Sequence, residues 1–165
     1  MKLRNIKIRN LGSFARNEGG GTLAELAILL PILAVMLAAV SEFGRYFQTY
    51  TTLSKATRSA ARYLSNHPFT PEEQAKAKNL VVCGKLTACG ANERLVAGME
   101  TSKVCIETTG SPNPETVTVR IPRTAGDCGA PQNYQPIFDI GALLHSSFDL
   151  SLPIAPSTTM RYVLE

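Results

Sequence analysis

One carboxylate interrupts a segment of the chain that is otherwise apolar enough to enter a lipid bilayer. Between Leu23 and Val40 the sequence has no Lys, Arg, Asp or His, and Glu25 is the single ionisable residue. A charged side chain at the centre of a membrane helix costs about 2.5–3.5 kcal/mol on insertion scales, and less near a helix end. Because such a residue is usually retained for a function, we expect the Glu25 carboxylate to have a positively charged partner.

The apolar segment has the length of a transmembrane helix. At about 1.5 Å per residue, the stretch from Leu23 to Val40 would extend roughly 27 Å, close to the thickness of the hydrocarbon core of a membrane. A buried core helix of a soluble protein is the alternative, but such a helix rarely lacks polar residues around its whole circumference over five turns. The pattern therefore predicts a single membrane-spanning helix over residues 21–41.

Charge is distributed unevenly about this segment. The first twenty residues hold five of the 17 Lys and Arg and one of the 13 Asp and Glu, which leaves 12 of each sign in the rest of the chain. The positive-inside rule then places a basic leader, residues 1–20, in the cytoplasm and everything after Val40 on the other side of the membrane. Since no basic face remains after the leader, we expect no nucleic-acid partner.

A secretory signal peptide is a second interpretation of the same segment. Small residues at Ala39-Val40-Ser41 would suit a signal peptidase, which would release a soluble domain beginning at Glu42. The apolar run is longer than the usual hydrophobic region of a signal peptide, however, and Glu25 would have no role in it. We therefore favour the membrane helix.

Residues around the apolar run resemble a known family. Gly-Gly-Thr-Leu-Ala-Glu-Leu-Ala-Ile-Leu-Leu-Pro-Ile-Leu at 20–33, followed by Ser-Glu-Phe-Gly-Arg-Tyr at 41–46, resembles the start of TadE-like pseudopilins. These are minor components of the tight-adherence (Tad, Flp-type IV) pilus system. Ala-Ala-Arg-Tyr at 60–63 and Thr-Met-Arg-Tyr at 159–162 also resemble family patterns. The likeness is strong over residues 16–64 and weak through most of the rest.

The resemblance implies processing beside the glycines. A dedicated prepilin peptidase would cut after Gly20, which makes Gly21 the first mature residue and Glu25 the fifth. Three successive glycines stand here, so a cut after Gly19 or after Gly21 stays open.

Electrostatics supports a role for Glu25 after such a cut. The new ammonium and the carboxylate would both lie in surroundings of low dielectric, where a close pair attracts by several kcal/mol at an effective dielectric constant near 20. Pairing between the amine of one subunit and Glu25 of its neighbour would fix the axial register of assembly. The alternative is that Glu25, near the end of the segment, reaches the cytoplasmic interface by itself.

The resemblance also implies a function and a location. It implies a minor pilin-like subunit that helps pilus assembly or initiation and surface adhesion, anchored in the bacterial inner membrane with its N-terminus cytoplasmic and its head periplasmic. The implied partners are the inner membrane, the prepilin peptidase, other pilin and pseudopilin subunits and the Tad assembly machinery. A permanently anchored periplasmic scaffold protein is the alternative.

A second helical pattern follows the apolar one. From Phe43 to Leu64 apolar residues recur at steps of three and four with polar residues between them, which predicts an amphipathic continuation of the helix over residues 42–66. Pro31 should kink the helix or loosen one turn because it lacks an N–H group, and Asn66-His67-Pro68 should end it near Ser65. We expect the aromatic stripe at 43–50 to pack against the head, with a belt at the membrane surface as the alternative.

Residues 67–165 have the size of one small α+β head. A helix is expected from Pro71 to about Val82. Strands are expected at 103–108 and 115–121, joined as a hairpin, and at 148–152 and 158–163. The predicted fold class is thus α+β, a pilin-like lollipop with one long N-terminal helix and a small antiparallel β-sheet head that packs on the amphipathic half of the helix.

Four cysteines lie in the exported part, at Cys83, Cys89, Cys105 and Cys128. An even number in an oxidising compartment favours disulfides, for which three connectivities exist. We prefer the pairing of near neighbours, Cys83 with Cys89 and Cys105 with Cys128. Zinc is disfavoured because no two cysteines have the short spacing of a zinc site and both histidines are remote in sequence.

Catalytic motifs are not apparent in the sequence. His67 adjoins a proline at a helix end, and His145 lies between leucine and serine, so both are expected at the surface. The glycines at 19–21 are followed by Thr22 and not by the Gly-Lys-Ser/Thr of a phosphate-binding loop. We therefore expect no enzyme activity, no cofactor and no metal site, and regard the chain as the substrate of an enzyme.

Overall fold

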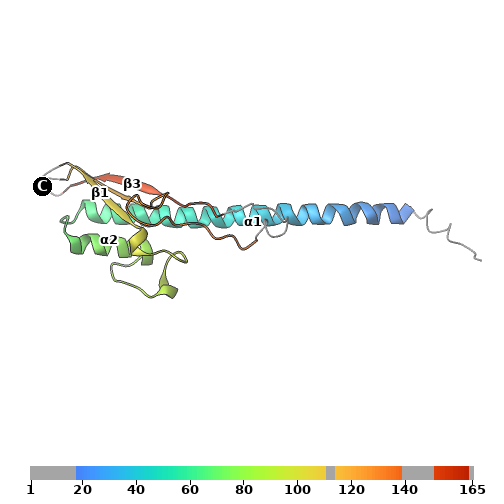
Figure 1. Cartoon of the computed structure of the whole chain (residues 1–165), viewed down its shortest axis with the longest axis horizontal. Coiled ribbons are helices and arrows are strands. Elements are labelled where there is room, and N and C mark those ends of the chain that lie inside the picture. Colours follow the sequence, from blue (N-terminus) through green and yellow to red (C-terminus); the bar gives the residue numbers. More distant parts are fainter. Residues whose placement is uncertain (1–17, 111–113, 139–150, 164–165) are drawn as a thin grey trace, which may run out of the picture. The chain divides into compact units, whose positions relative to one another are not determined.

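The computed structural model describes residues 18–110, 114–138 and 151–163, with side chains from Gly20 onward. It contains two α-helices, two short 3-10 helices and a three-stranded antiparallel sheet (Figure 1). The expected α+β class, with a long N-terminal helix and a small antiparallel sheet, is confirmed. Contacts divide the chain into two compact units, Met1–Ser41 and Glu42–Glu165.

Helix α1 runs from Glu18 to Ser65 over 48 residues. It ends where the sequence predicts, since the following Asn66-His67-Pro68 disfavours helical geometry, and it begins three residues before the predicted start at residue 21. Helical backbone continues through Pro31, so the kink expected there stays a prediction. The part of α1 in the first unit is apolar and exposed, and α1 is long and apolar enough to cross a membrane.

The second part of α1 supplies one wall of the head core. Leu53, Ala60, Ala61 and Leu64 are fully buried, and Ala56 is nearly so. These residues recur at steps of three and four, as an amphipathic helix requires. The predicted apolar face is therefore confirmed from Leu53 to the end of the helix.

The aromatic residues of the stripe at 43–50 do not all pack in the way that the sequence predicted. Only Tyr46 packs into the head, where its ring meets the ring of Tyr134 edge-on with centroids 5.6 Å apart. Phe43, Phe47 and Tyr50 are 70%, 58% and 39% exposed, so the expectation that the whole stripe packs against the head was wrong. At 3.6 residues per turn Phe43, Phe47 and Tyr50 lie about 60°, 100° and 40° round the helix from Tyr46.

Helix α2, Pro71–Cys83, confirms the predicted short helix and has clear signals at both ends. The hydroxyl oxygen of Thr70 accepts a hydrogen bond from the Glu73 amide at 3.4 Å, and Pro71 occupies the first turn, where its missing N–H costs nothing. Gly84 ends the helix in the left-handed region at φ 69°, a conformation that favours glycine. Its buried face, which includes Ala77 and Val81, joins the same core as α1.

Strands β1 (Cys105–Thr109), β2 (Thr116–Arg120) and β3 (Ser157–Arg161) form the sheet in the order β1-β2-β3. Both pairs are antiparallel, with Cys105 opposite Arg120 and Val117 opposite Met160. The predicted hairpin and the predicted C-terminal strand are thus confirmed, while residues 111–113 of the connecting turn lie outside the described residues.

The strand predicted at 148–152 is not part of this sheet. Residues 148–150 lie outside the described residues, and 151–152 are not in a strand. An isolated antiparallel bridge joins Asn133 and Pro153 instead, through hydrogen bonds of 2.7 and 2.8 Å between segments 132–134 and 152–154. The alternating sequence here pairs with an irregular segment rather than with a strand.

One face of the sheet packs on the second part of α1 (Figure 1). Val117 and Val119 of β2 are fully buried in the cluster that contains Leu53 and Leu64. Polar contacts tie β3 and the residues after it to the same helix: the Thr57 and Thr158 hydroxyl oxygens lie 3.3 Å apart, and the Val163 amide donates to the Ser65 carbonyl at 3.0 Å. The expected packing of the amphipathic half of α1 on the sheet is confirmed.

The four cysteines form two disulfides, Cys83–Cys89 and Cys105–Cys128, with Cα atoms 6.0 and 5.8 Å apart. This is the near-neighbour pairing that the sequence favours. The first fastens the end of α2 to the loop that follows it. The second joins the first residue of β1 to the loop after β2 and closes 23 residues of chain, a constraint of about 3 kcal/mol in the loop-entropy model.

Replacing Leu53 with alanine should destabilise the head. The side chain is fully buried between α1, α2 and the sheet, and a cavity left by Leu→Ala costs about 2–5 kcal/mol. Leu86→Ala is the matched control, because Leu86 is 43% exposed and its loss should change the free energy of unfolding by less than about 1 kcal/mol. Urea unfolding of the full chain in detergent measures both, and equal losses would contradict this core assignment.

Candidate functional site in the long helix

The first part of α1 exposes apolar side chains around the helix. Leu23, Ile28 and Leu29 are 68%, 68% and 52% exposed, and at about 100° per residue they point to three different sides of the helix. Glu25 is exposed among such residues, and no hydrogen bond or ion pair to another described residue involves its carboxylate. The structure thus leaves this carboxylate available to a group from outside the described part of the chain.

Gly20 and Gly21 begin the described part of this helix. A Cβ atom on either glycine would meet nothing within 4 Å, so packing within the chain does not require glycine at these positions. The space beside both glycines is instead open to another molecule. The rest of the predicted leader, residues 1–17, lies outside the described residues.

A second carboxylate, that of Glu42, lies at the start of the head, and it is buried whereas Glu25 is exposed. Glu42 is only 6% exposed. Its side-chain oxygens accept hydrogen bonds from the Tyr134 hydroxyl and from the backbone N–H groups of Ile137 and Phe138, the latter two at 2.9 Å. We call this arrangement of Glu42, Tyr134, Ile137 and Phe138 the Glu42 clamp, because it fastens an irregular segment to α1 across more than 90 residues of sequence.

The clamp holds its carboxylate in the charged form. Burial by itself would raise the pKa of Glu42, but the hydrogen bonds from Tyr134, Phe138 and Ile137 outweigh burial and lower the pKa below its ordinary value of 4.5. Burial and the bond to Glu42 raise the pKa of Tyr134. The tyrosine therefore stays a neutral donor to an ionised acceptor, which is the stronger kind of hydrogen bond.

Sequence reasoning did not find the clamp. It treated Glu42 as part of a motif and as a charge after the apolar run. A signal was present, because Glu42, Tyr46 and Leu53 follow one face of the helix, and an acid on a buried face needs partners. Which residues those partners are could not be read from the sequence.

The comparison with known proteins concerns the helix described above. Residues 20–62 match the family model of TadE-like proteins. The match covers this segment and no more of the chain. It includes Gly20, Gly21, Glu25 and Glu42, and it ends one residue before Tyr63. No curated protein and no solved structure matches the chain.

The similarity to TadE-like proteins is confined to residues 20–62 of the long helix. The resemblance expected from the sequence is thereby confirmed for the helix. Most of the head lies outside residues 20–62, so its description rests on the contacts in the structure.

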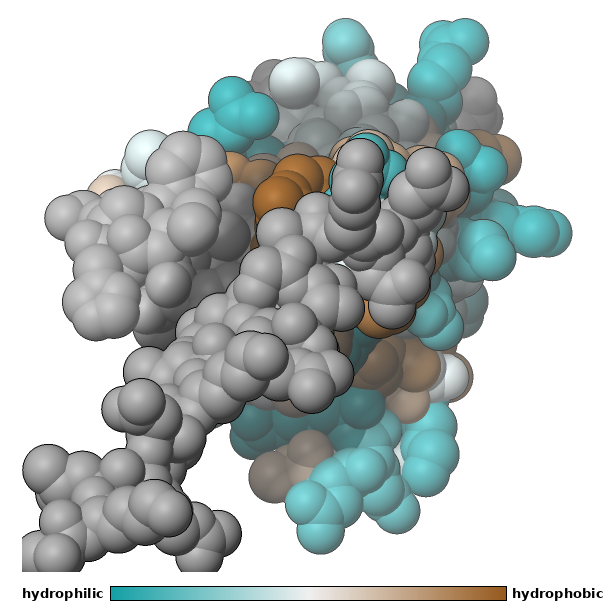
Figure 2. Space-filling view, turned by 90° about the vertical axis from the view of Figure 1, so that its right-hand side faces the viewer, coloured by the Kyte–Doolittle hydropathy of each residue, from teal (hydrophilic) through white to brown (hydrophobic). Residues whose placement is uncertain are grey.

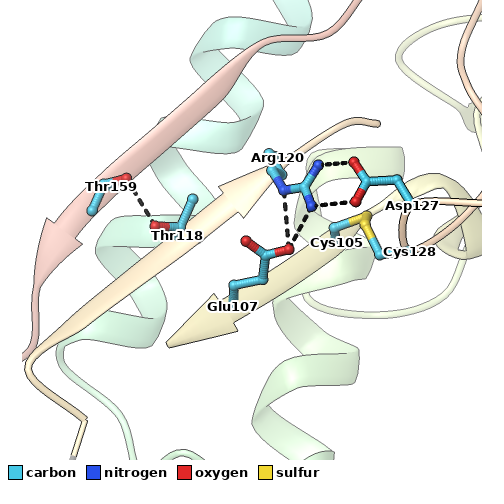
Figure 3. Close-up of polar contacts among 7 residues, drawn as sticks. All are labelled: Cys105, Glu107, Thr118, Arg120, Asp127, Cys128 and Thr159. Carbon is cyan, nitrogen blue, oxygen red and sulfur yellow. Dashed lines mark hydrogen bonds and ion pairs between the residues drawn. A yellow bond between two sulfur atoms is a disulfide. The ribbon is translucent and has the colours of Figure 1, made fainter. Parts of the chain in front are cut away.

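A separate polar cluster fastens the loop after β2 (Figure 3). The Arg120 guanidinium donates to Glu107 on β1 at 3.1 Å through Nε and makes a two-point contact with Asp127, one bond of which is 2.8 Å. The hydrogen bond from Arg120 lowers the pKa of Asp127. The disulfide Cys105–Cys128 lies beside this cluster, so the loop is held by a covalent and an ionic tie.

These residues could be mistaken for a metal site. Ligand atoms of Glu107, Asp127 and Cys128 lie within 4.8 Å of one another. The Cys128 sulfur is already bonded to Cys105, however, and both carboxylates already form ion pairs with Arg120. The arrangement is a structural ion pair rather than a cation site.

His67 and His145 were expected at the surface rather than in a catalytic site. The His67 ring stacks on Tyr63 with centroids 4.0 Å apart, and its Nδ1 lies 2.8 Å from the Tyr63 carbonyl oxygen. It packs at the end of α1, as expected for a residue beside a helix end. His145 lies outside the described residues.

The Glu42 clamp should make stability depend on pH. A carboxylate whose pKa is lowered in the folded protein contributes stability above its ordinary value of 4.5, and this contribution is lost as pH falls through the lowered pKa. Glu42→Gln should therefore lower the free energy of unfolding by about 1–3 kcal/mol at pH 7. The difference in free energy of unfolding between Glu42→Gln and the native chain should become smaller as pH falls below 4.5.

Urea unfolding between pH 3 and 7 measures this difference. Asp127→Asn is a useful comparison, because the pKa of Asp127 is lowered in the same direction by a hydrogen bond from Arg120 at the end of β2. A gap between the native chain and Glu42→Gln that stays constant across this range would show that the charge of Glu42 does not stabilise the head.

Proposed function

We propose that the protein is a minor pilin-like subunit, a pseudopilin, of a Tad-type IV pilus. A prepilin peptidase removes the basic leader after Gly20, and the helix over residues 21–41 holds the subunit in the inner membrane until it enters a pilus. The head lies on the periplasmic side and contributes to pilus initiation and surface adhesion. In this proposal the chain is the peptidase's substrate and not itself an enzyme.

One observation carries this proposal: the match to TadE-like proteins covers the part of α1 before Glu42, whose apolar side chains are exposed and whose single carboxylate, Glu25, has no described partner in its own chain. Exposed apolar side chains fit a helix that is surrounded first by lipid and then by the helices of other subunits. A carboxylate in such surroundings needs a positive partner.

The amine released at Gly21 supplies that partner. It lies four residues before Glu25, about 6 Å along a helix, so amine and carboxylate occur at nearly the same level of every subunit. A pair at 4 Å attracts by about 4 kcal/mol at an effective dielectric constant of 20. Joining the amine of one subunit to the carboxylate of the next would set how far neighbouring helices are displaced.

The disulfides support a head outside the cytoplasm. Both lie after the apolar segment, and structural disulfides persist in oxidising compartments and are rare in the cytosol. The basic leader before the segment supports the same orientation by the positive-inside rule. These two features are independent of each other and of the family match.

The mature N-terminus tests the proposal against its rivals. Intact mass analysis of the protein from its native membrane should give a chain that begins at Gly21, with Gly20 or Thr22 as the start if the cut is one bond away. A chain that begins at Met1 would indicate a permanently anchored scaffold protein. A chain that begins at Glu42 would indicate a soluble domain released by signal peptidase. Either of the last two results would overturn the pseudopilin proposal.

Replacing Glu25 tests the pairing mechanism. Glu25→Ala should insert into the membrane and lose its leader normally, but its recovery in sheared surface pili should fall at least about tenfold, since a loss of 1.4 kcal/mol already suffices for that. Glu25→Asp is the control, because it keeps the charge with one methylene less and should retain more incorporation. Immunoblots of membrane and pilus fractions measure this, and full incorporation of Glu25→Ala would remove the carboxylate from the mechanism.

A further inference from the structure

We propose that four exposed apolar side chains around Glu42 form a collar that inserts into the headgroup layer of the membrane that α1 crosses. The collar consists of Phe43 and Phe47 on α1 and of Ile137 and Phe138 on the segment held by the Glu42 clamp. This inference requires that α1 anchors the protein in a membrane, and it is independent of any role in a pilus.

The exposure of these side chains is the first observation. Phe43, Phe47, Ile137 and Phe138 are 70%, 58%, 62% and 49% exposed. They belong to two segments that the clamp brings together. The backbone N–H groups of Ile137 and Phe138 both donate hydrogen bonds to the carboxylate of Glu42, the residue before Phe43. Large apolar side chains gathered in this way mark a surface that contacts something other than water.

Continuity with the candidate membrane helix identifies what covers the collar. Phe43 and Phe47 lie three and seven residues after Val40 on an uninterrupted helix, or roughly 5 and 10 Å farther along its axis. The headgroup regions add about 5–8 Å on each side of a 30 Å hydrocarbon core. Aromatic side chains are enriched in this layer, because it accepts apolar rings next to polar groups.

The charge pattern of α1 fits the same layer. Arg45 lies between the two phenylalanines and is exposed, so it can reach the phosphate groups of the lipids. In the view of Figure 2 hydrophilic side chains project around the outer edge while hydrophobic surface appears toward the middle. A protein partner with an apolar groove would not require a cation at this level of the helix.

The clamp explains how a loop can enter this layer. Backbone N–H groups that approach hydrocarbon must be satisfied within the protein, because water is scarce there. The Glu42 carboxylate satisfies the N–H groups of Ile137 and Phe138 and the Tyr134 hydroxyl, and it is itself buried beneath them. The loop can therefore present two apolar side chains without exposing unpaired amides.

Tryptophan fluorescence gives a direct test, because the chain contains no tryptophan. The full chain carrying Phe43→Trp, Phe138→Trp or Leu86→Trp is reconstituted at high lipid-to-protein ratio in phosphatidylcholine–phosphatidylglycerol vesicles, with or without lipids brominated near the headgroup end of the acyl chains. We expect at least twofold quenching at positions 43 and 138. The control at position 86, an exposed residue of the head loop, should be unquenched.

A second comparison separates the loop from the helix. In the Glu42→Ala background, quenching at Phe138→Trp should fall by at least half while quenching at Phe43→Trp persists, because α1 still crosses the membrane. Phe138→Trp in the native background tests the collar even where Glu42→Ala disturbs the head. The mature N-terminus and pilus incorporation are measured separately, so failure of the collar and failure of the pilus proposal can be told apart.

Two outcomes would overturn the collar. The first is emission from Phe138→Trp that brominated lipid leaves unchanged while Phe43→Trp is quenched, which would place the loop in water. The second is emission from both positions that shifts with protein density and not with bromine, which would show that a second copy of the chain covers the surface.

Discussion

One continuous helix has to be stable in two different surroundings, and this constraint shapes the rest of the structure. Up to Ser41, α1 exposes apolar side chains, which only lipid or other helices can cover. From Glu42 it is the spine of a small core, with Leu53 and Leu64 fully buried against the sheet and α2. The head can be small because α1 supplies much of its apolar surface, and two disulfides add to its stability.

Local sequence signals predicted much of this arrangement. The stop at Asn66-His67-Pro68, the proline that begins α2 and the pairing of β1 with β2 depend on neighbouring residues, and all three are found where expected. The periodicity after Leu53 gave the buried face of α1 for the same reason. Patterns of this kind are reliable when the residues that interact are close in sequence.

The rest depended on contacts between distant segments. In the stripe at 43–50 the aromatic residues lie within about 100° of one another round the helix, so hydrophobicity could not tell that Tyr46 packs against Tyr134 while Phe43 and Phe47 remain exposed. The segment that selects the buried face lies about 90 residues away and is irregular. It also pairs with residues 152–154 through the isolated Asn133–Pro153 bridge.

Glu25 and Glu42 show two solutions to the same problem, and the contrast bears on function. Both carboxylates lie on α1 next to apolar residues, where an ionised oxygen without partners is costly. The fold satisfies Glu42 with a hydroxyl and two amides of its own chain. It provides no such partner for Glu25 among the described residues. If Glu25 served only the stability of this chain, a fold that can enclose one carboxylate would be expected to enclose the other. The pairing proposed above, with an amine of another molecule, would account for its isolation on this part of the helix.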